Sequence, residues 1–350
     1  MPRPLVRGSI RALDGYVPGE QPRPGARVVK LNTNENPYPP SPRVMDAIRA
    51  VPAHALQRYP RPMADEFRAA ASKALGVPED AILAGNGSDD ILTIATRTFL
   101  DPGDALAYPD PTYSLYPVLA RLQDARVVTV PWGEGWSLPV DALAASGARA
   151  IYLANPNAPT GTQVPVSAVE ALAKAFDGAL LVDEAYVDFA DEHCLDLALR
   201  LPNVIVSRTM SKSYALAGMR FGFAVSRPET IREMAKVKDS YNCDAVSIAA
   251  AAAAIADQDY ARSTWAKIRA ERSRMTGALE ALGWSVLPSQ ANFVFATVPG
   301  GRASRVHSAL KAAGVLVRYF DLPGLDDKLR ITVGTSDDTD ALLAAIRAIR

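Results

Sequence analysis

The sequence contains few residues that could form a metal site or a disulfide. Its 350 residues include two cysteines and three histidines, and neither cysteine stands in a CxxC or Cys/His ligand spacing. A structural zinc site is therefore not expected. The sequence also lacks an HExxH pattern, so it does not indicate a catalytic metal. We expect Cys194 and Cys243 to be reduced, packed thiols of a protein from a reducing compartment.

The chain also has no excess of charge of either sign and no long apolar run. Lys+Arg and Asp+Glu each number 38, which argues against a general affinity for nucleic acid or for an anionic membrane. The N-terminus contains no apolar stretch of signal-peptide length. The longest apolar run, Ile248–Ala256, predicts a buried helix, because a membrane span needs about 20 residues. We expect a cytoplasmic protein without nucleic-acid or membrane partners.

Short apolar runs alternate with helical stretches from about Val44 onward. Several runs are apolar on both faces, as in parallel strands that helices cover on both sides. Helices predicted at Asp89–Leu100 and Ser167–Phe176 separate them, and this alternation favours an open α/β sheet. The predicted strands are Ala81–Ala84, Ala105–Tyr108, Val127–Val130, Ala150–Ala154, Ala179–Val182, Val204–Ser207 and Phe221–Val225.

The pattern changes after about Ser226. Helices are predicted at Ile231–Lys238 and Tyr260–Leu282, followed by strands at Trp284–Leu287, Phe293–Thr297, Val315–Arg318 and Leu329–Val333. The fold class is therefore α/β, with a large domain built on a mostly parallel open sheet flanked by helices, plus a smaller α+β domain. The expected division is an N-terminal arm at residues 1–43 that joins the small domain, a large domain at 44–243 and a small domain at 244–350.

Ligands of open α/β sheets bind beyond the carboxyl ends of the strands. The first predicted strand is followed by Gly85–Asp90, whose glycines allow close backbone approach and whose helix start offers free N–H groups to a phosphate. The same segment is compatible with a tight turn capped by Ser88 or Asp89. Its spacing matches neither the dinucleotide nor the nucleotide-triphosphate fingerprint, which argues against a nucleotide-binding dehydrogenase.

Two further strand ends carry polar residues. Asp183 ends an apolar strand, where a buried carboxylate needs a cation such as a protonated pyridine nitrogen, although it could also cap the next helix. Tyr186 follows and could reach a neighbouring oxygen. Lys212 follows another buried strand; most lysines are solvated, but one that is desolvated near Arg220 has a lowered pKa and reacts with carbonyls. Ser211 and Arg220 suit an anion, and the set as a whole suits a pyridoxal-type cofactor.

With these residues in view, the sequence resembles the fold-type-I aminotransferases and, within them, the histidinol-phosphate aminotransferases. The resemblance covers nearly the whole chain. The matching stretches are Leu31–Tyr38, Arg58–Pro60, Gly85–Asp90, Pro111–Tyr113, Asn155–Gly161, Asp183–Tyr186, Arg208–Lys212, Leu216–Arg220 and Leu329–Thr335.

The resemblance implies a role for each site residue. Lys212 would hold pyridoxal 5'-phosphate as a Schiff base and later move the substrate proton. Asp183 would pair with the ring nitrogen, Tyr186 would hydrogen-bond the phenolic oxygen, and Tyr113 would stack on the ring. The backbone N–H groups of Ser88 and Asp89 would hold the cofactor phosphate together with Ser211 and Arg220. Tyr59 of a second subunit would also reach this phosphate, which implies a homodimer with shared active sites.

One position departs from the pattern of the superfamily. The residue before Pro-Thr-Gly, usually an asparagine that bonds the phenolic oxygen, is Ala158. Either Asn157 compensates from one residue away or Tyr186 acts alone. We expect some loss of ring tuning but no loss of the cofactor.

The resemblance assigns the substrate phosphate to Tyr16, Arg318 and Arg330, and the carboxylate of the second substrate to Arg330. Two arginines suit a dianionic phosphate better than one carboxylate, although Arg318 could instead form a surface ion pair with Asp321. The predicted reaction converts L-histidinol phosphate and 2-oxoglutarate to imidazole acetol phosphate and glutamate. The alternatives are an aromatic amino-acid aminotransferase, a threonine-phosphate decarboxylase and a non-catalytic ligand sensor on the same fold.

Overall fold

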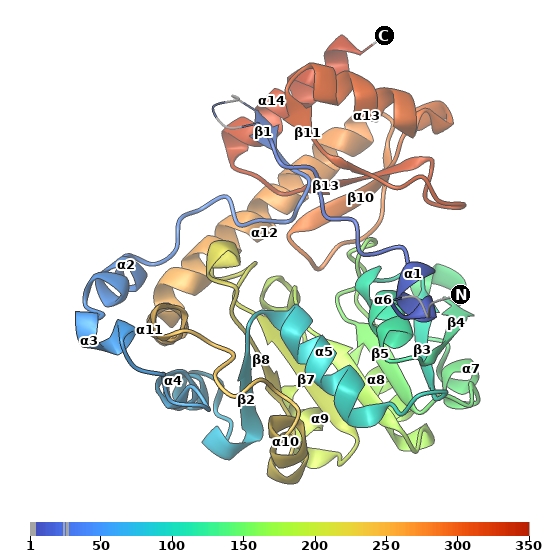
Figure 1. The fold of residues 1–350 in the computed structure, drawn as a ribbon. Helices are drawn as coiled ribbons and strands as arrows, with labels where there is room; N and C mark the ends of the chain where they lie inside the picture. Colours follow the sequence, from blue (N-terminus) through green and yellow to red (C-terminus); the bar gives the residue numbers. More distant parts are fainter. Residues whose placement is uncertain (1–4, 24, 26–27, 350) are drawn as a thin grey trace.

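A seven-stranded sheet forms the centre of the larger part of the molecule (Figure 1). The structure is a computed structural model that describes residues 5–23, 25 and 28–349. The strand order is β2-β8-β7-β6-β5-β3-β4, and β8 alone runs antiparallel to its neighbours within this sheet of described strands. The strands are β2 (Ile82–Gly85), β3 (Ala105–Asp110), β4 (Arg126–Pro131), β5 (Ala150–Ala154), β6 (Ala179–Asp183), β7 (Val204–Thr209) and β8 (Gly222–Val225).

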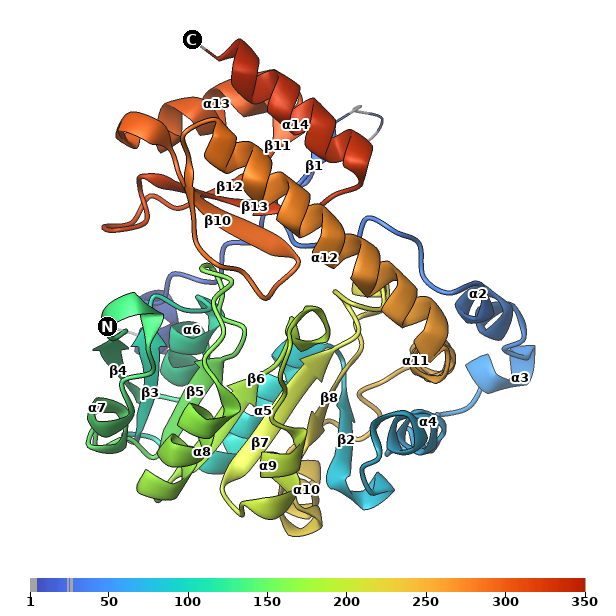
Figure 2. The same ribbon diagram turned by 180° about the vertical axis from the view of Figure 1, so that it is seen from behind.

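Helices cover both faces of this sheet, so its strands contribute to two hydrophobic cores. Along β7, Val204 and Val206 belong to one core and Ile205 to the other, because successive strand residues point to opposite faces. Figures 1 and 2 show the two layers from opposite sides. One layer contains α5 (Ser88–Phe99), α6 (Leu115–Leu122) and α10 (Pro228–Ala235); the other contains α4 (Asp65–Leu75), α7 (Val140–Ala144), α8 (Val166–Ala175), α9 (Leu195–Arg200) and α11 (Ala245–Ala256).

A smaller antiparallel sheet, in the order β12-β13-β10-β9, lies above the edge of the large sheet in Figure 1. Three helices contribute to its core, which contains Met275, Val306 and Leu342. The strands are β9 (Ser285–Val286), β10 (Phe293–Thr297), β12 (Arg318–Tyr319) and β13 (Lys328–Thr332), and the helices are α12 (Gln258–Ala281), α13 (Ala303–Ala312) and α14 (Ser336–Ala348).

The N-terminal segment connects both parts of the molecule. Helix α1 (Gly8–Arg11) packs beside α6, and β1 (Val29–Lys30) forms a parallel pair with β11 (Val315–Leu316) beside the small sheet. The chain then returns along the large domain through α2 (Pro42–Arg49) and α3 (Ala53–Leu56). Short 3-10 turns lie at Glu79–Ala81, Glu134–Trp136, Val187–Phe189, Ala217–Met219 and Pro299–Gly301.

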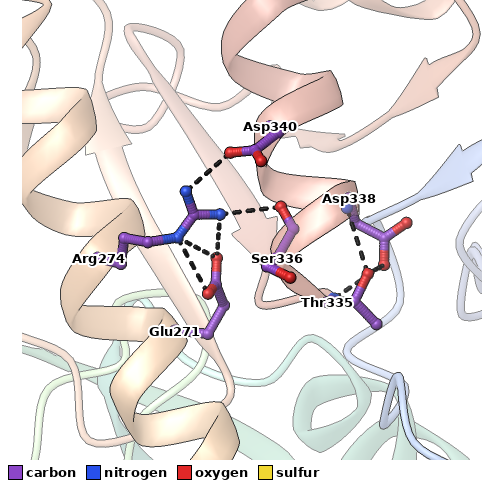
Figure 3. Close-up of polar contacts among 6 residues, drawn as sticks. All are labelled: Glu271, Arg274, Thr335, Ser336, Asp338 and Asp340. Atoms are coloured by element: carbon purple, nitrogen blue, oxygen red, sulfur yellow. Dashed lines mark hydrogen bonds and ion pairs between the residues drawn. The ribbon is translucent and has the colours of Figure 1, made fainter.

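A polar cluster joins α12 to α14 in the small domain (Figure 3). Arg274 forms a bidentate ion pair with Glu271 and also contacts Asp340 at 2.8 Å and the carbonyl of Ser336 at 2.9 Å. Thr335 caps α14 through a capping box, which satisfies backbone N–H groups that the first turn of a helix leaves free. This cluster positions the turn that follows β13, the strand on which Arg330 lies.

The predicted α/β fold class is confirmed, and the large-sheet strands lie within one or two residues of their predicted ends. The predicted strand Val315–Arg318 is wrong as a single element: β11 pairs with the N-terminal segment, whereas β12 belongs to the small sheet. Pairing with a segment so far away in the chain leaves no local signal in the sequence. The strand predicted at Trp284–Leu287 is shorter, spanning Ser285–Val286.

The expected domain boundary at residue 244 remains a prediction. Helix α11 packs against α2 and α4, on the large domain. The first half of α12 contributes Trp265 and Ile268 to a large-sheet core, while Met275 and Leu279 of its second half belong to the small-sheet core. We therefore propose that the division lies within α12 rather than before α11.

The described residues contain no helix that is long and apolar enough to span a bilayer. A search of the same residues finds no His, Cys, Asp and Glu cluster that could hold a metal ion. Cys194 and Cys243 are both buried and unpaired.

A buried ion pair lies directly behind the cleft edge of the large sheet. Arg208 in β7 contacts Glu184 at 2.8 Å, and the two side chains are 7% and 1% exposed. Glu184 also accepts the backbone N–H of Cys194 at 2.5 Å. Because both charges are out of water, each depends on the other for compensation.

Removing one partner of this pair should destabilise the protein strongly. Arg208→Met is expected to lower the free energy of unfolding by about 3–5 kcal/mol, because Glu184 would remain buried and unpaired. Urea unfolding of the cofactor-free protein measures the loss. The matched control is Lys236→Met, which breaks an exposed pair with Glu233 and should have a much smaller effect. Equal losses in the two variants would contradict the importance assigned to burial.

Candidate active site

A cleft of about 850 Å³ is lined by the carboxyl ends of the large-sheet strands, by the small sheet and by the N-terminal segment. Because β2, β5, β6 and β7 all run in the same direction, their carboxyl ends share this edge. Most of the predicted site residues line the cleft: Tyr16, Ser88, Asp89, Tyr113, Asp183, Tyr186, Ser211, Lys212, Arg220, Arg318 and Arg330.

Lys212 enters the cleft from the loop after β7. Its ammonium donates a hydrogen bond to the backbone carbonyl of Thr33 at 2.9 Å. Burial, reinforced by the positive charge of Arg330, lowers the pKa of Lys212 to about 8. A substantial fraction of this amine is therefore neutral near physiological pH, as a nucleophile toward a carbonyl requires.

Asp183 stands at the end of β6 and is 4% exposed. Within the described chain its carboxylate accepts hydrogen bonds from two neutral donors, the Tyr116 hydroxyl at 2.9 Å and the Ala185 N–H at 3.2 Å. Burial raises the pKa of Asp183 to about 7. A cationic N–H placed against this carboxylate would stabilise its charged form.

The start of α5 forms the anion-binding end of the cleft. Gly87 is the N-cap at φ +91° and contributes no capping side chain. A Cβ on Gly222 would lie 2.5 Å from the backbone nitrogen of Ser88, so glycine at this position keeps the β8 backbone against the helix start. Free N–H groups and the positive end of the helix dipole therefore face the same space.

Arg220 completes this end of the site. Its guanidinium lies 3.6 Å from the Asp89 carboxylate and donates to the Ser211 hydroxyl at 3.3 Å. Arg220 has a left-handed backbone at φ +48°, uncommon for a residue other than glycine. A guanidinium, a hydroxyl and a helix N-terminus around one space are suited to bind a phosphate.

Aromatic residues form one wall of the cleft. Tyr113 donates to Asp89 at 3.1 Å, and its ring makes edge contacts with Tyr16 and Tyr116. Tyr186 packs edge-on against Phe293, which comes from the small sheet, with ring centroids 5.0 Å apart. A flat ring bound between the strand edge and Tyr113 would thus be bordered by aromatic surface.

The small domain contributes two arginines to the cleft. Arg330 donates to the carbonyl of Asn32 at 3.2 Å, but its buried Nε has no hydrogen-bond partner among the described atoms. Burial lowers the pKa of Arg330. Its guanidinium lies over the rings of Phe293 and Phe320, and that of Arg318 lies 5.4 Å from the Phe320 ring centroid. Desolvated guanidinium groups with a free N–H bind carboxylates and phosphates well.

Two residues predicted for the site do not line the described cleft. Asn157 is buried, and its amide donates to Pro111 and Thr160 and accepts from Thr112. The structure therefore does not support compensation for Ala158 by Asn157. Tyr59 is 79% exposed and stacks on Tyr241 at 4.3 Å, outside the cleft.

Sequence reasoning missed three contributors. Tyr116 supports Asp183 from α6, and nothing in its sequence context distinguishes it from a core tyrosine. Thr33 and Asn34 lie in Leu31–Tyr38, a stretch that carries the family resemblance, but the sequence indicates no role for either residue. Asn34 donates to the Tyr186 hydroxyl at 3.0 Å.

Comparison with known proteins agrees with this geometry. The model of the family "Aminotransferase class I and II" matches residues 26–346. The chain is 47% identical over 341 residues to histidinol-phosphate aminotransferase 1 of Trichormus variabilis, covering 97% of each chain. It is 48% identical over 342 residues to the histidinol-phosphate aminotransferase of Rhodopirellula baltica, covering 97% of this chain and 94% of the relative.

A solved structure has the same fold. The histidinol-phosphate aminotransferase of Sinorhizobium meliloti in complex with pyridoxal-5'-phosphate superposes with a TM-score of 0.90 at 28% identity, over 99% of this chain and 98% of that one. These matches extend over both the large and the small domain. The chain therefore belongs to the aminotransferase class I and II family.

Proposed function

We propose that the protein transfers the amino group of L-histidinol phosphate to 2-oxoglutarate, with pyridoxal 5'-phosphate as cofactor. The observation that carries this proposal is that Arg318, Arg330 and Tyr16 line the same cleft as the helix α5 anion site, with both arginines coming from the small domain. One anion site suits the cofactor phosphate and the other suits an anionic substrate. The names of relatives at 47% and 48% identity support the same assignment.

The cleft residues fit pyridoxal phosphate at each functional group. The α5 start with Ser211 and Arg220 would hold the phosphate, and Asp183 supplies a buried carboxylate that lacks a cationic partner in the described chain. Lys212 supplies an amine of lowered pKa. When bound, the cofactor withdraws electrons from the substrate Cα, which makes a proton on that carbon acidic.

The residues of the chain then have separate tasks. Lys212 would hold the cofactor through Nζ and, as a free amine, would take the Cα proton of the substrate. Asp183 would keep a proton on the ring nitrogen, because an anionic carboxylate in a dry site favours the charged form of its partner. Tyr186 would donate a hydrogen bond to the phenolic oxygen. The same Nζ would also give this proton back, so Lys212 would act as base and then as acid.

The choice of donor depends on how the arginines act. A substrate phosphate can bind the guanidinium groups of Arg318 and Arg330 together, whereas a carboxylate needs only one guanidinium group. The second candidate is an aromatic amino-acid aminotransferase, and the apolar side chains of Phe320 and Leu322 in the cleft lining favour it. These two donors differ in their dependence on Arg318, which separates the functions experimentally.

Arg318→Gln tests the donor assignment. In the wild-type protein, L-histidinol phosphate alone should rapidly remove the absorption band of the bound cofactor, and 2-oxoglutarate should restore it. The variant should need about 10–100-fold more histidinol phosphate for the same effect, because a charge-assisted hydrogen bond to phosphate is lost. L-phenylalanine serves as the control, and the cofactor band should respond to it equally in the wild type and in the variant. A faster response to phenylalanine than to histidinol phosphate in the wild type would instead support the aromatic aminotransferase.

The lowered pKa of Lys212 predicts how the cofactor-free protein captures pyridoxal phosphate. The neutral amine reacts, so the capture rate should rise about tenfold per pH unit up to about pH 8 and level off above it. Stopped-flow absorbance measures this rate. Nα-acetyl-lysine in solution, which keeps a free side-chain amine, is the reference, and its reaction rate should keep rising toward about pH 10. A protein profile that follows the free amine would show that burial does not activate Lys212.

We also propose a homodimer in which Tyr59 completes the phosphate site of a second copy. Tyr59 stacks on Tyr241, and the two rings are 79% and 45% exposed; Leu56, three residues before Tyr59 in the chain, is 67% exposed. Tyr59 lies outside the cleft of its own chain, so a contribution to a site requires a second subunit. Large exposed apolar side chains gathered in one place are typical of an interface.

Mixing two defective chains tests the shared site. Lys212→Ala cannot hold the cofactor covalently, and Tyr59→Ala should bind it weakly. If Tyr59 acts across the interface, each hybrid dimer contains one intact site, and about a quarter of all sites in an equimolar mixture regain activity at limiting cofactor. If Tyr59 acts within its own chain, or not at all, mixing restores no activity. Mixing wild type with each variant separately controls for simple dilution.

A further inference from the structure

We infer that Asn34 is a positioning residue that directs the Tyr186 hydroxyl proton into the cleft, toward the phenolic oxygen of the cofactor. This inference rests on the proposed function and assigns to the N-terminal segment a part in tuning the ring. The observation that carries it is the hydrogen bond of 3.0 Å from Nδ2 of Asn34 to Oη of Tyr186.

The position of Asn34 is closely determined. The residue is 1% exposed and has a left-handed backbone at φ +56°, a conformation that asparagine tolerates better than most residues. Its carbonyl accepts a hydrogen bond from the Asn292 amide at 2.9 Å. A side chain held in this way can orient a neighbour without much loss of entropy of its own.

The hydrogen-bond network determines which end of the Asn34 amide faces the tyrosine. The backbone N–H of Asn34 donates to the Thr332 hydroxyl at 2.9 Å, so a lone pair of that hydroxyl is occupied. The Thr332 proton then has an acceptor in Oδ1 of Asn34, at 3.1 Å. The flipped amide would leave the buried Thr332 proton without an acceptor among the described atoms, so Oδ1 turns to Thr332 and Nδ2 donates to Tyr186.

An amide that donates to Oη leaves the tyrosine proton for another acceptor. Among the described residues, the structure records no acceptor for that proton, and Tyr186 lines the cleft. Burial raises the pKa of the Tyr186 phenol, which keeps the hydroxyl protonated. The remaining direction for donation is therefore the cleft, where the proposed cofactor oxygen would accept.

The surroundings of residue 158 explain why this support is needed. Ala158 packs with Ala291, Phe293 and Tyr186 and offers no polar side-chain atom. The Asn157 amide is committed to other partners. Tyr186 would therefore be the donor to the ring oxygen, and Asn34 is the described side chain that orients it.

The same contact links the ring to the substrate end of the site. Thr332, which orients Asn34, lies in β13 two residues after Arg330, and residues i and i+2 of a strand face the same side. The hydrogen bond from Arg330 to Asn32 and the hydrogen bond from Thr332 to Asn34 thus hold one segment from one strand face. A shift of β13 would therefore move Asn34, the residue that sets the direction of the Tyr186 hydroxyl proton.

Asn34→Asp reverses the hydrogen bond with little change in shape. Aspartate accepts, so the Tyr186 proton would turn toward residue 34 and away from the cofactor. The measurement is the pH midpoint at which the absorption band of the cofactor on Lys212 changes, without substrate. The midpoint should rise by about one to two units, because the anionic ring oxygen loses a charge-assisted hydrogen bond.

A double-mutant cycle with Tyr186→Phe separates this effect from the added negative charge. Charge acts in both backgrounds, whereas reorientation of the hydroxyl needs the hydroxyl. The shift caused by Asn34→Asp should therefore be larger by about one unit when Tyr186 is present than in the Tyr186→Phe background. Equal shifts in the two backgrounds would overturn the inference. The proposed function would still stand in that case if the protein shows the cofactor band and the band responds to histidinol phosphate.

Asn34→Gly provides a second, uncharged variant that preserves the positive φ. It should raise the midpoint by about half a unit when Tyr186 is present, because the unsupported hydroxyl would donate to water part of the time. In the Tyr186→Phe background it should leave the midpoint unchanged. An unchanged midpoint in this variant with Tyr186 present would contradict the inference. Absence of the cofactor band already in the wild type would instead contradict the proposed function.

Discussion

The direction of the strands in the large sheet determines where chemistry can occur in this molecule. Because β2, β5, β6 and β7 run in the same direction, their carboxyl ends bring the α5 start, Asp183 and Lys212 to one edge. The buried pair of Glu184 and Arg208 adjoins the same edge and holds β6 beside β7. The anion site, the acid and the amine are thus positioned by the backbone before any ligand binds, as electrostatic preorganisation requires.

The N-terminal segment lies between this edge of the large sheet and the small domain, and it contacts both. Within three residues it accepts hydrogen bonds from Thr332 at the Leu31 carbonyl, from Arg330 at the Asn32 carbonyl and from Lys212 at the Thr33 carbonyl. The segment therefore contacts the amine that reacts and the arginine proposed to bind the substrate. Both groups are cations with lowered pKa values, and backbone carbonyls stabilise them without adding a full negative charge.

The site could be predicted from the sequence where local pattern and chemistry coincide. Asp183 and Lys212 each follow a buried strand, so an unusual residue type at an unfavourable position indicated a function. Asn157 was a reasonable candidate because of its neighbours in the chain, but its amide turns to Pro111 and Thr160. Side-chain direction in a loop depends on packing, which adjacency in sequence does not specify. Tyr116 illustrates the converse, since an ordinary helical core tyrosine becomes a hydrogen-bond donor to Asp183 through tertiary contact.

By itself, the sequence determined the α/β class, the approximate strands of the large sheet and the residue types at their ends, because these depend on local periodicity and on the cost of burying charge. Tertiary structure alone decided that Val315 would pair with the N-terminal segment and that the chain after Val317 would enter a different sheet. It also decided that Asn34 would meet Tyr186, 152 positions away. Such contacts join residues whose separation in the chain carries no pattern, so they are specified only when the whole core has packed.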